Sequence, residues 1–244
     1  TLDTGARLER AVEAVLARHA DADFCILAGD LADHGEAAAY QRLKTIIAHL
    51  PIPVHITLGN HDNRPVFLDV FGADFAAETG KVDKVIDADG YRIILLDSSE
   101  PGRVDGVLEA VQVDWLRARL AEAMDRPVIV VLHHNANALH IHSDPIRLLE
   151  PDAFIDALKT HPDIRQVIAG HVHLTSTAMW RGLPFTTLAG GHYSVDFAVD
   201  KPDAFMRHIS GPGQMAVVVG TPDRTTVLFD DFIDGNADIA WPPA

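Results

Sequence analysis

Four short apolar runs in the sequence end in polar residues of the types that bind metal ions. They are FCILAGD, which ends at Asp30; VHITLGNHD, which ends at Asn60, His61 and Asp62; PVIVVLHH, which ends at His133 and His134; and RQVIAGHVH, which ends at His171 and His173. Carboxylate, amide oxygen and imidazole suit Mn²⁺, Fe²⁺ or Zn²⁺ without any thiolate. Because ligands gather beyond the carboxyl ends of strands in open α/β sheets, the repeated ending predicts a metal site.

Each ending also has an ordinary explanation when it is taken alone. Asp30 after a glycine is typical of a turn, GNHD is rich in turn formers, and a His-x-His pair can be structural. In an extended chain His133 and His134 point in opposite directions, so at most one of them faces the site. Because His133 lies at the strand end, we expect it to face the site and His134 to support it or pack in the core. His171 and His173 face the same side if the chain stays extended, which suits two ligands.

The elements that must position these residues alternate between strand and helix. Apolar residues at helical spacing predict helices over 4–20, 36–50, 113–120 and 153–158. Short apolar runs predict strands over 24–28 and 54–58, and again at PVIVVL and IRQVIA. This alternation predicts an α/β protein.

The sheet is predicted to be mixed, because Asp89 and Gly90 form a strong hairpin signal within KVIDADGYRIILLD. TAMWRGLPFTTLA, MAVVVG and TTVLFD are typical of successive antiparallel strands. Residues 134–149 show no periodicity, and we expect a functional loop or lid there. Since no linker or repeat interrupts the chain, residues 1–244 are predicted to form a single domain.

The composition excludes several classes of function. The chain has 35 acidic and 20 basic residues and a formal charge of −15, and no run of lysine or arginine exists to coat a nucleic acid. No apolar stretch is long enough to span a bilayer, and the first residues lack the apolar core of a signal peptide. The single cysteine, Cys25, cannot form a disulfide within the chain. We therefore expect a cytoplasmic protein without a membrane or nucleic-acid partner. Whether the chain forms a homo-oligomer is left open.

Taken together and in order, GDLADHG (29–35), GNHD (59–62), HH (133–134) and GHVH (170–173) resemble the motifs of the calcineurin-like metallophosphoesterases. Within that superfamily AAAYQRLK, YRIILLDSSEPGRVDGVLEAVQVDWL and IRQVIAGHVH are similar to class III cyclic nucleotide phosphodiesterases and bacterial glycerophosphodiesterases. The resemblance covers nearly the whole chain. It implies an αββα sandwich of two mixed sheets flanked by helices, and a pair of divalent ions that are Mn, Fe or Zn.

The resemblance also implies a set of metal ligands. Asp30 would bridge the two ions, and His173 would join it on the first. The second ion would be completed by Asn60, His133 and His171. The family's Asp-x-His motif, which ends its first strand and supplies the other ligands of the first ion, does not occur in this sequence. We therefore expect that strand to be absent from this chain and the first metal site to be incomplete.

The resemblance further implies the residues that handle substrate. His61 would contact the phosphate and protonate the leaving group, a role that suits imidazole near neutral pH. Asp62 would orient an imidazole, and Asn60 would touch substrate as well as metal. His192, which follows two glycines in AGGHYS, either lines the site as a substrate contact or sits in a turn. For Arg64 a contact with phosphate is one interpretation, and a solvated arginine at a helix start is the one that we expect.

These assignments predict a dinuclear-metal hydrolase of phosphodiesters, which are cyclic nucleotides or small phosphodiesters such as glycerophosphodiesters. In it a hydroxide activated by the metals attacks phosphorus. The absent Asp-x-His motif favours an alternative, a metal-binding protein of this fold without activity. A phosphomonoesterase or phosphonate ester hydrolase of the same fold is a further alternative. A nuclease is disfavoured, because the acidic chain shows no basic groove.

Overall fold

The computed structural model describes residues 2–201 and 207–234, and its elements follow the predicted alternation. The α-helices are α1 (Thr4–Arg18), α2 (Ala37–Ile47), α3 (Arg64–Phe71), α4 (Ala110–Ala121) and α5 (Asp152–Leu158). The strands are β1 (Cys25–Ala28), β2 (Val54–Thr57), β3 (Lys84–Ala88), β4 (Tyr91–Leu96), β5 (Val128–Leu132), β6 (Ile164–Ala169), β7 (Ser176–Trp180), β8 (Leu183–Thr187), β9 (Ser194–Val195), β10 (His208–Ile209), β11 (Gly213–Thr221) and β12 (Arg224–Ile233). Short 3-10 turns lie at Ala73–Phe75 and Asp144–Ile146.

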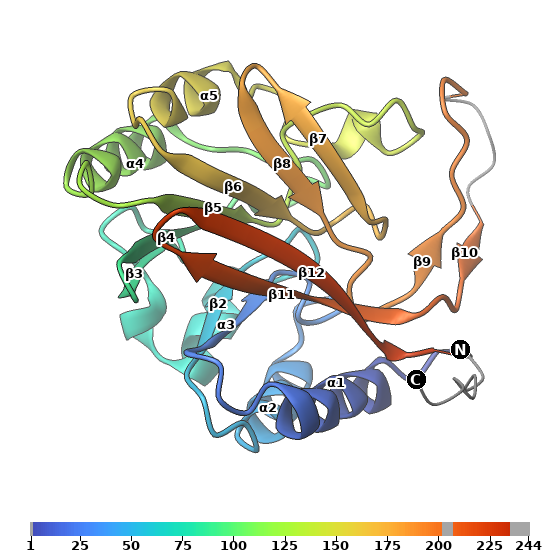
Figure 1. Ribbon diagram of the computed structural model, residues 1–244. Coiled ribbons are helices and arrows are strands. Elements are labelled where there is room, and N and C mark those ends of the chain that lie inside the picture. The colour runs from blue at the N-terminus through green and yellow to red at the C-terminus, as the bar shows by residue number, and fades with distance from the viewer. Residues whose placement is uncertain (1, 202–206, 235–244) are drawn as a thin grey trace, which may run out of the picture.

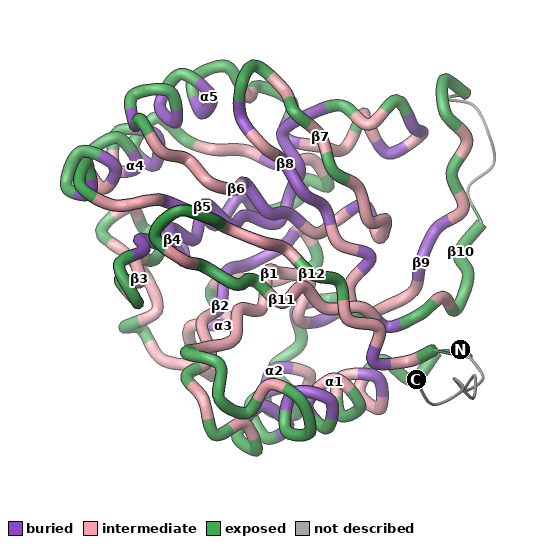
Figure 2. Tube along the Cα trace, in the orientation of Figure 1, coloured by how far each residue is buried: buried purple, intermediate pink, exposed green. Residues whose placement is uncertain are grey.

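A six-stranded mixed sheet with the order β3-β4-β5-β6-β8-β7 forms one layer of the molecule (Figure 1). The central strands β4, β5, β6 and β8 run parallel, while β3 and β7 pair antiparallel at the two edges. The predicted hairpin at Asp89 and Gly90 is confirmed, because β3 and β4 pair directly across it. Every residue of β4 and β5 is buried, as expected for parallel strands covered on both faces (Figure 2).

A second β layer faces this sheet. It consists of the parallel pair β1 and β2 and the long antiparallel hairpin β11 and β12, which form two separate two-stranded sheets among the described residues. Ile93, Val131 and Ile168 of the large sheet form a buried cluster, against which Ile26 of β1 and Val227 of β12 pack. This apolar contact holds the two β layers together.

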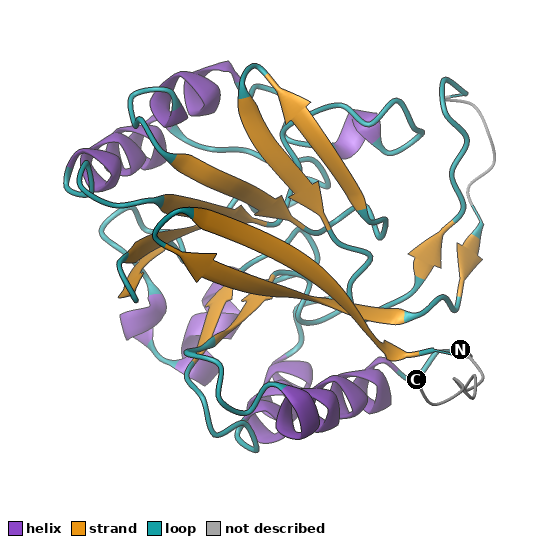
Figure 3. Cartoon of the chain, in the orientation of Figure 1, coloured by secondary structure: helices purple, strands orange, loops and turns teal. Residues whose placement is uncertain are grey.

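Helices cover the outer faces of both β layers (Figure 3). Leu116 of α4 and Phe154 of α5 pack in the core on the outer side of the large sheet. On the opposite side Tyr40 of α2 and Phe67 of α3 pack with Ile56 of β2. The predicted αββα arrangement is therefore confirmed, with the second β layer divided into two strand pairs.

Two expectations for the later part of the chain need correction. The last strands do not continue one antiparallel series, because β8 pairs parallel with β6 whereas β11 and β12 form their own hairpin. After β8 the chain leaves the large sheet, and β9 pairs with β10 before the β11–β12 hairpin begins. The segment 134–149 is irregular as expected, yet residues 134–137 are buried, so its first part packs inside the protein.

Among the described residues, no helix combines the length and the apolar character that crossing a membrane requires.

Candidate metal centre

Strand register brings the four predicted polar endings to one edge of the two β layers. Ala28 of β1 lies opposite Thr57 of β2, so the loops that carry Asp30 and Asn60 leave the layer side by side. In the large sheet Leu132 of β5 pairs with Ala169 of β6, which places the following histidines next to each other. The rings of His133 and His171 lie 5.1 Å apart between centroids.

Two glycines allow these loops to approach closely. A Cβ atom at Gly59 would lie 2.3 Å from Oδ1 of Asp30, and a Cβ at Gly29 would lie 2.6 Å from Nδ1 of His133. Real Cβ atoms do not reach such distances. Gly29 also adopts a φ of 92°, which glycine tolerates best. The glycines before Asp30 and Asn60 therefore have a packing role besides their role in turns.

Asp30 and His133 face each other in an arrangement that requires a cation between them. Nδ1 of His133 lies 2.7 Å from the Ala28 carbonyl, and because a carbonyl only accepts, this nitrogen carries the proton. Nε2 of His133 then lies 3.2 Å from Oδ2 of Asp30, so that a lone pair meets a carboxylate. Burial lowers the pKa of His133, but Asp30 outweighs this and raises it above its usual value. A proton, or a metal ion in its place, satisfies both groups.

Three buried donor atoms at this edge fit a bound metal ion. Oδ1 of Asn60, Nε2 of His133 and Nε2 of His171 are all buried, and none has a hydrogen-bond partner among the described residues. Buried polar atoms are rarely left without partners unless an ion or water takes that place. Burial and the nearby His133 lower the pKa of His171 to about 3, and burial with His192 lowers that of His173 to about 4. Both imidazoles are therefore neutral near pH 7, which is the form that binds metal.

The backbone at three of the predicted ligands is strained. Asp30, His171 and His173 have φ values of 54°, 64° and 48°, a region that residues other than glycine rarely adopt. Val172 N donates to the carbonyl of Gly170 at 2.7 Å and closes a tight turn around His171. The chain is therefore not extended here, and the expectation that alternation alone aligns the two histidines is wrong. Such strain persists where surrounding structure enforces it, often at functional sites.

His134 lies in the same cluster but has both ring nitrogens engaged. The ligand atoms of His133, His134 and His171 all lie within 4.8 Å of one another. However, Nε2 of His134 donates to the Val104 carbonyl at 3.1 Å, and Nδ1 accepts from Ser98 Oγ at 2.7 Å. Burial and the neighbouring histidines lower its pKa well below the usual value. His134 thus supports the site as a neutral packing residue.

His61 has one ring nitrogen fixed and the other free to act. Its Nδ1 donates to the carbonyl of Asp33 at 2.8 Å, which leaves Nε2 as the outer atom of a ring whose side chain is 45% exposed. The backbone N–H of His61 donates to Oδ1 of Asp30 at 3.0 Å. Asp33 was not singled out from the sequence, although a second carboxylate three residues after Asp30 is a signal that points to it.

The expectation that Asp62 orients an imidazole is wrong. Its carboxylate accepts from the backbone N–H groups of Leu31 and Gly59 and from the hydroxyl of Tyr40, at 2.9–3.0 Å. Burial raises the pKa of Asp62 to about 6. Asp62 therefore joins the loop after β1 to the loop after β2. A carboxylate suits this position because two backbone donors converge on it.

Arg64 is not solvated, which corrects a second expectation. Its Nε donates to Oδ2 of Asp97 at 2.7 Å and its Nη2 donates to the Ser99 carbonyl at 2.8 Å. Asp97 is fully buried at the end of β4. The sequence LLDSSE is thus a fifth polar strand ending, which was not among the four that the sequence predicted. Asp97 of this segment contacts Arg64, the residue after GNHDN, and Ser98 contacts His134.

His192 lies beside the ring of His173, with centroids 5.6 Å apart. Burial lowers its pKa, and the charges of Asp30, Asp33 and His61 also act on it. The structure thus brings His192 into the electrostatic neighbourhood of the other predicted site residues. Its contact with substrate stays a prediction.

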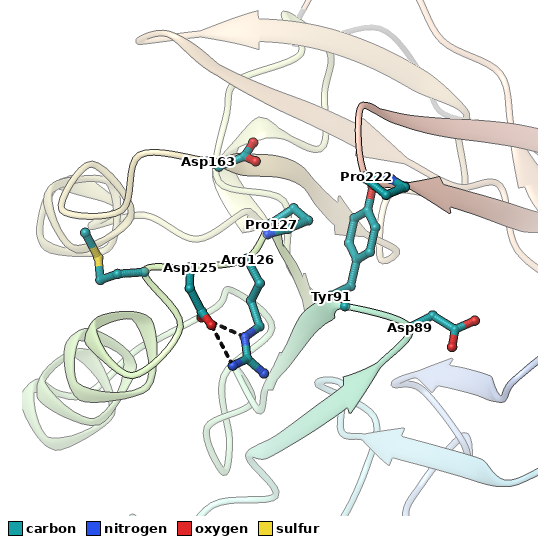
Figure 4. Close-up of a pocket in the computed structure, with 9 residues that line it drawn as sticks. Asp89, Tyr91, Asp125, Arg126, Pro127, Asp163 and Pro222 are labelled. Carbon is teal, nitrogen blue, oxygen red and sulfur yellow. Dashed lines mark hydrogen bonds and ion pairs between the residues drawn. The ribbon is translucent and has the colours of Figure 1, made fainter.

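A surface hollow of about 400 Å³ lies at the opposite edge of the large sheet (Figure 4). Tyr91 begins β4, and Pro127 and Asp163 precede β5 and β6, so this hollow borders the amino ends of the strands. Its only arginine among the lining residues, Arg126, is paired with Asp125. An acidic hollow without a free cation does not suit an anionic phosphodiester.

Comparisons with known proteins agree with this geometry. A model of the calcineurin-like phosphoesterase family matches residues 3–174, and the chain belongs to this family. It is 33% identical to the 3′,5′-cyclic adenosine monophosphate phosphodiesterase CpdA of Pseudomonas aeruginosa, covering 83% of this chain and 72% of that protein. It is 27% identical to a probable glycerophosphodiester phosphodiesterase GpdQ of Arcobacter nitrofigilis, covering 86% and 78%. A dimetal phosphatase structure from Danio rerio has a TM-score of 0.62 at 17% identity, covering 94% and 89%.

These findings confirm the predicted family, fold class and enzyme class, a metal-dependent phosphodiesterase. The family uses divalent metals, and the histidine cluster of this chain offers a place for them. The metal identities, the roles of single residues and the substrate stay predictions.

Proposed function

We propose that this chain hydrolyses small phosphodiesters at a divalent metal centre, with cyclic nucleotides and glycerophosphodiesters as the candidate substrates. The observation that carries the proposal is the convergence of Asn60, His133 and His171 beside Asp30, with buried donor atoms that make no hydrogen bond among the described residues. Together with Asp30 they would hold one ion. Asp30 and His173 would contribute to the other. The names of the two bacterial relatives reported above describe enzymes that act on these two kinds of diester.

When bound, the metal ions supply positive charge to the phosphoryl oxygens and make a water nucleophilic near neutral pH. The residues of the chain do the remaining work. Breaking the bond between phosphorus and the leaving oxygen sends an electron pair to that oxygen, which then needs a proton. Nε2 of His61 donates it when the ring is the imidazolium, and the hydrogen bond from Nδ1 to the Asp33 carbonyl fixes the direction of the ring. Asp62 keeps the two loops in place without touching substrate.

The alternative function is metal binding without turnover. It is favoured by one observation: the sequence contains no Asp-x-His motif, so only Asp30 and His173 are assigned to the first ion. One experiment separates the two functions. The product of the full-length gene is freed of metal, reloaded with Mn²⁺, and tested on 3′,5′-cyclic AMP, glycerophosphoethanolamine and p-nitrophenyl phosphate.

The proposal predicts Mn²⁺-dependent release of product from at least one of the two diesters, faster than from the monoester. Faster monoester hydrolysis would assign the chain to the phosphomonoesterases of this fold. Tight Mn²⁺ binding with no turnover of any substrate would support the silent alternative and contradict the proposal.

A further inference from the structure

We propose that the rings of His192, Tyr193 and His208 form a subsite for the base of a nucleotide substrate, beside the metal centre. This inference rests on the proposed function and names the substrate class within it. It favours nucleoside-containing diesters over glycerophosphodiesters, because only a base offers a flat ring to stack on aromatic side chains.

The rings form a continuous series that starts at a predicted metal ligand. Tyr193 stacks on His173 with centroids 4.1 Å apart and ring planes at 15°. His192 lies 4.8 Å from Tyr193, and His208 lies 4.5 Å from it on a different strand. We call His192, Tyr193 and His208 the ring cluster. In a cyclic nucleotide one sugar ring separates the base from phosphorus. A base bound at the ring cluster would lie one or two side-chain rings away from His173, which agrees with that separation.

The ring cluster is held in place by backbone contacts. Nδ1 of His173 donates to the Tyr193 carbonyl at 3.0 Å. The buried guanidinium of Arg7 donates to the Gly191 carbonyl at 2.8 Å, which fixes the residue before His192. Gln214 N donates to the Gly190 carbonyl at 2.9 Å from β11. A subsite that positions a ligand needs such support, because loose rings gain little from stacking.

One side of the ring cluster is open to a ligand. His208 is exposed, and His192 and Tyr193 are half-buried. The strand pair β9 and β10 sets the spacing, since Val195 pairs with His208. None of the hydrogen bonds found in the described residues engages the ring nitrogens of His192 or His208, so both can serve the edge of a base.

The test compares a diester that has a base with one that lacks it. The full-length protein loaded with Mn²⁺ is assayed on 3′,5′-cyclic AMP and on glycerophosphoethanolamine. His208→Ala removes the outer ring and His208→Phe restores a ring without the nitrogens. His49→Ala, at an exposed histidine just after the end of α2, is the matched control. Tyr193→Leu and Tyr193→Phe form a second pair that separates the ring from the hydroxyl.

We expect His208→Ala to raise KM for cyclic AMP about fivefold or more, from the usual strength of stacking, and to leave the base-free diester within about twofold. His208→Phe should recover most of the loss. Equal changes on both substrates, or no change on cyclic AMP in either His208→Ala or Tyr193→Leu, would overturn the subsite. So would a dimer that His208→Ala dissociates, because the ring cluster would then be a contact between copies.

A second readout keeps this inference separate from the proposed function. Saturation-transfer NMR detects adenosine bound to the metal-free protein without any turnover. Signal from the base protons that His208→Ala removes supports the subsite, even if the wild-type protein hydrolyses neither diester and the proposed function fails. Absence of signal, with turnover of cyclic AMP intact, overturns the subsite and leaves the proposed function standing.

Discussion

His61 is the residue with the most clearly defined chemical task, because its tautomer is set by a backbone carbonyl. The Asp33 carbonyl accepts from Nδ1 and leaves Nε2 as the outer ring nitrogen, which carries a proton for the leaving group when the ring is the imidazolium. The neighbouring His34 is more exposed, at 76% of its side chain, and contacts only Asp33 among the ion pairs of the described residues. The two histidines therefore offer a comparison between a placed ring and a nearby solvated one.

His61→Ala is expected to reduce kcat for a diester by about 10² to 10⁴, the usual contribution of a positioned proton donor. The loss should be greatest for alkoxide leaving groups and smallest for p-nitrophenolate, which needs little protonation. Metal content, measured by atomic emission, should stay unchanged. His34→Ala is the control and should retain activity within about twofold. Equal losses for both leaving groups would contradict the role of His61 as the proton donor.

Gly59 matters for a different reason, which is the space it leaves. Gly59→Ala would bring a Cβ atom to 2.3 Å from Asp30, so the Asp30 carboxylate must move. We expect at least a tenfold loss of Mn²⁺ affinity, in line with the usual effect of disturbing metal ligands. At Gly170 the same Cβ would meet its nearest neighbour at 3.7 Å, so Gly170→Ala should bind Mn²⁺ normally. Isothermal titration of Mn²⁺ into both variants measures their Mn²⁺ affinities. Equal affinities would contradict the packing argument.

At the scale of elements, the ion pair between Arg64 of α3 and Asp97 after β4 joins this helix to the large sheet. Arg64→Ala leaves a fully buried carboxylate without its partner and is expected to lower the free energy of unfolding by about 3–5 kcal/mol. Arg10→Ala breaks the exposed pair with Glu13 and should change the free energy of unfolding by well under about 1 kcal/mol. Urea unfolding measures both. Similar small losses would show that the buried pair contributes little.

Asp83 gives the structure a pH dependence away from the metal ligands. It is buried before β3, where it accepts from Gln112 of α4 and from the backbone of Asp97, and burial raises its pKa to about 6. The unfolded value is about 3.9. The stability associated with the protonated form is thus fully present below about pH 3.9 and is lost as pH rises through about 6.

Asp83→Asn keeps the shape and most hydrogen bonds of this site but cannot ionise. We therefore expect the stability of the wild-type protein relative to Asp83→Asn to fall between pH 4 and pH 7.5, by on the order of 1–3 kcal/mol. Urea unfolding at several pH values gives this difference. A constant difference over the whole range would mean that Asp83 is ionised in the folded protein at pH 4.

At the scale of the whole molecule, the layers and the ligand candidates could be predicted because each depends on local pattern. Buried strands are short apolar runs, and a glycine followed by a ligand residue marks their ends, as at Asp30 and Asn60. The alternation of an extended strand indicated that only one of His133 and His134 faces the site, and the position of His133 at the strand end decided between them. The placement of both rings agrees with it, since the nitrogens of His134 are occupied and Nε2 of His133 is not.

The features that could not be predicted depend on contacts between distant segments. Asp62 was given a wrong partner and Arg64 was expected to be solvated, because the backbone N–H of Leu31 and the carboxylate of Asp97 come from segments that follow other strands. The bend at His171 requires a left-handed backbone, which no residue type there suggests. The ring cluster joins residues on both sides of a loop, so no window of sequence contains it. The formation of a homo-oligomer likewise stays a prediction.

The central claim is that the polar strand endings hold the metal on which catalysis depends. The most direct measurement titrates Mn²⁺ into metal-free full-length protein and follows bound Mn²⁺ and hydrolysis of 3′,5′-cyclic AMP in the same samples, for the wild type and for His171→Ala. Hydrolysis in the wild type should rise in step with bound Mn²⁺ and reverse on adding EDTA. His171→Ala should bind less Mn²⁺ and lose activity in proportion. Undiminished hydrolysis by the metal-free wild type, or full Mn²⁺ binding by His171→Ala, would contradict the account.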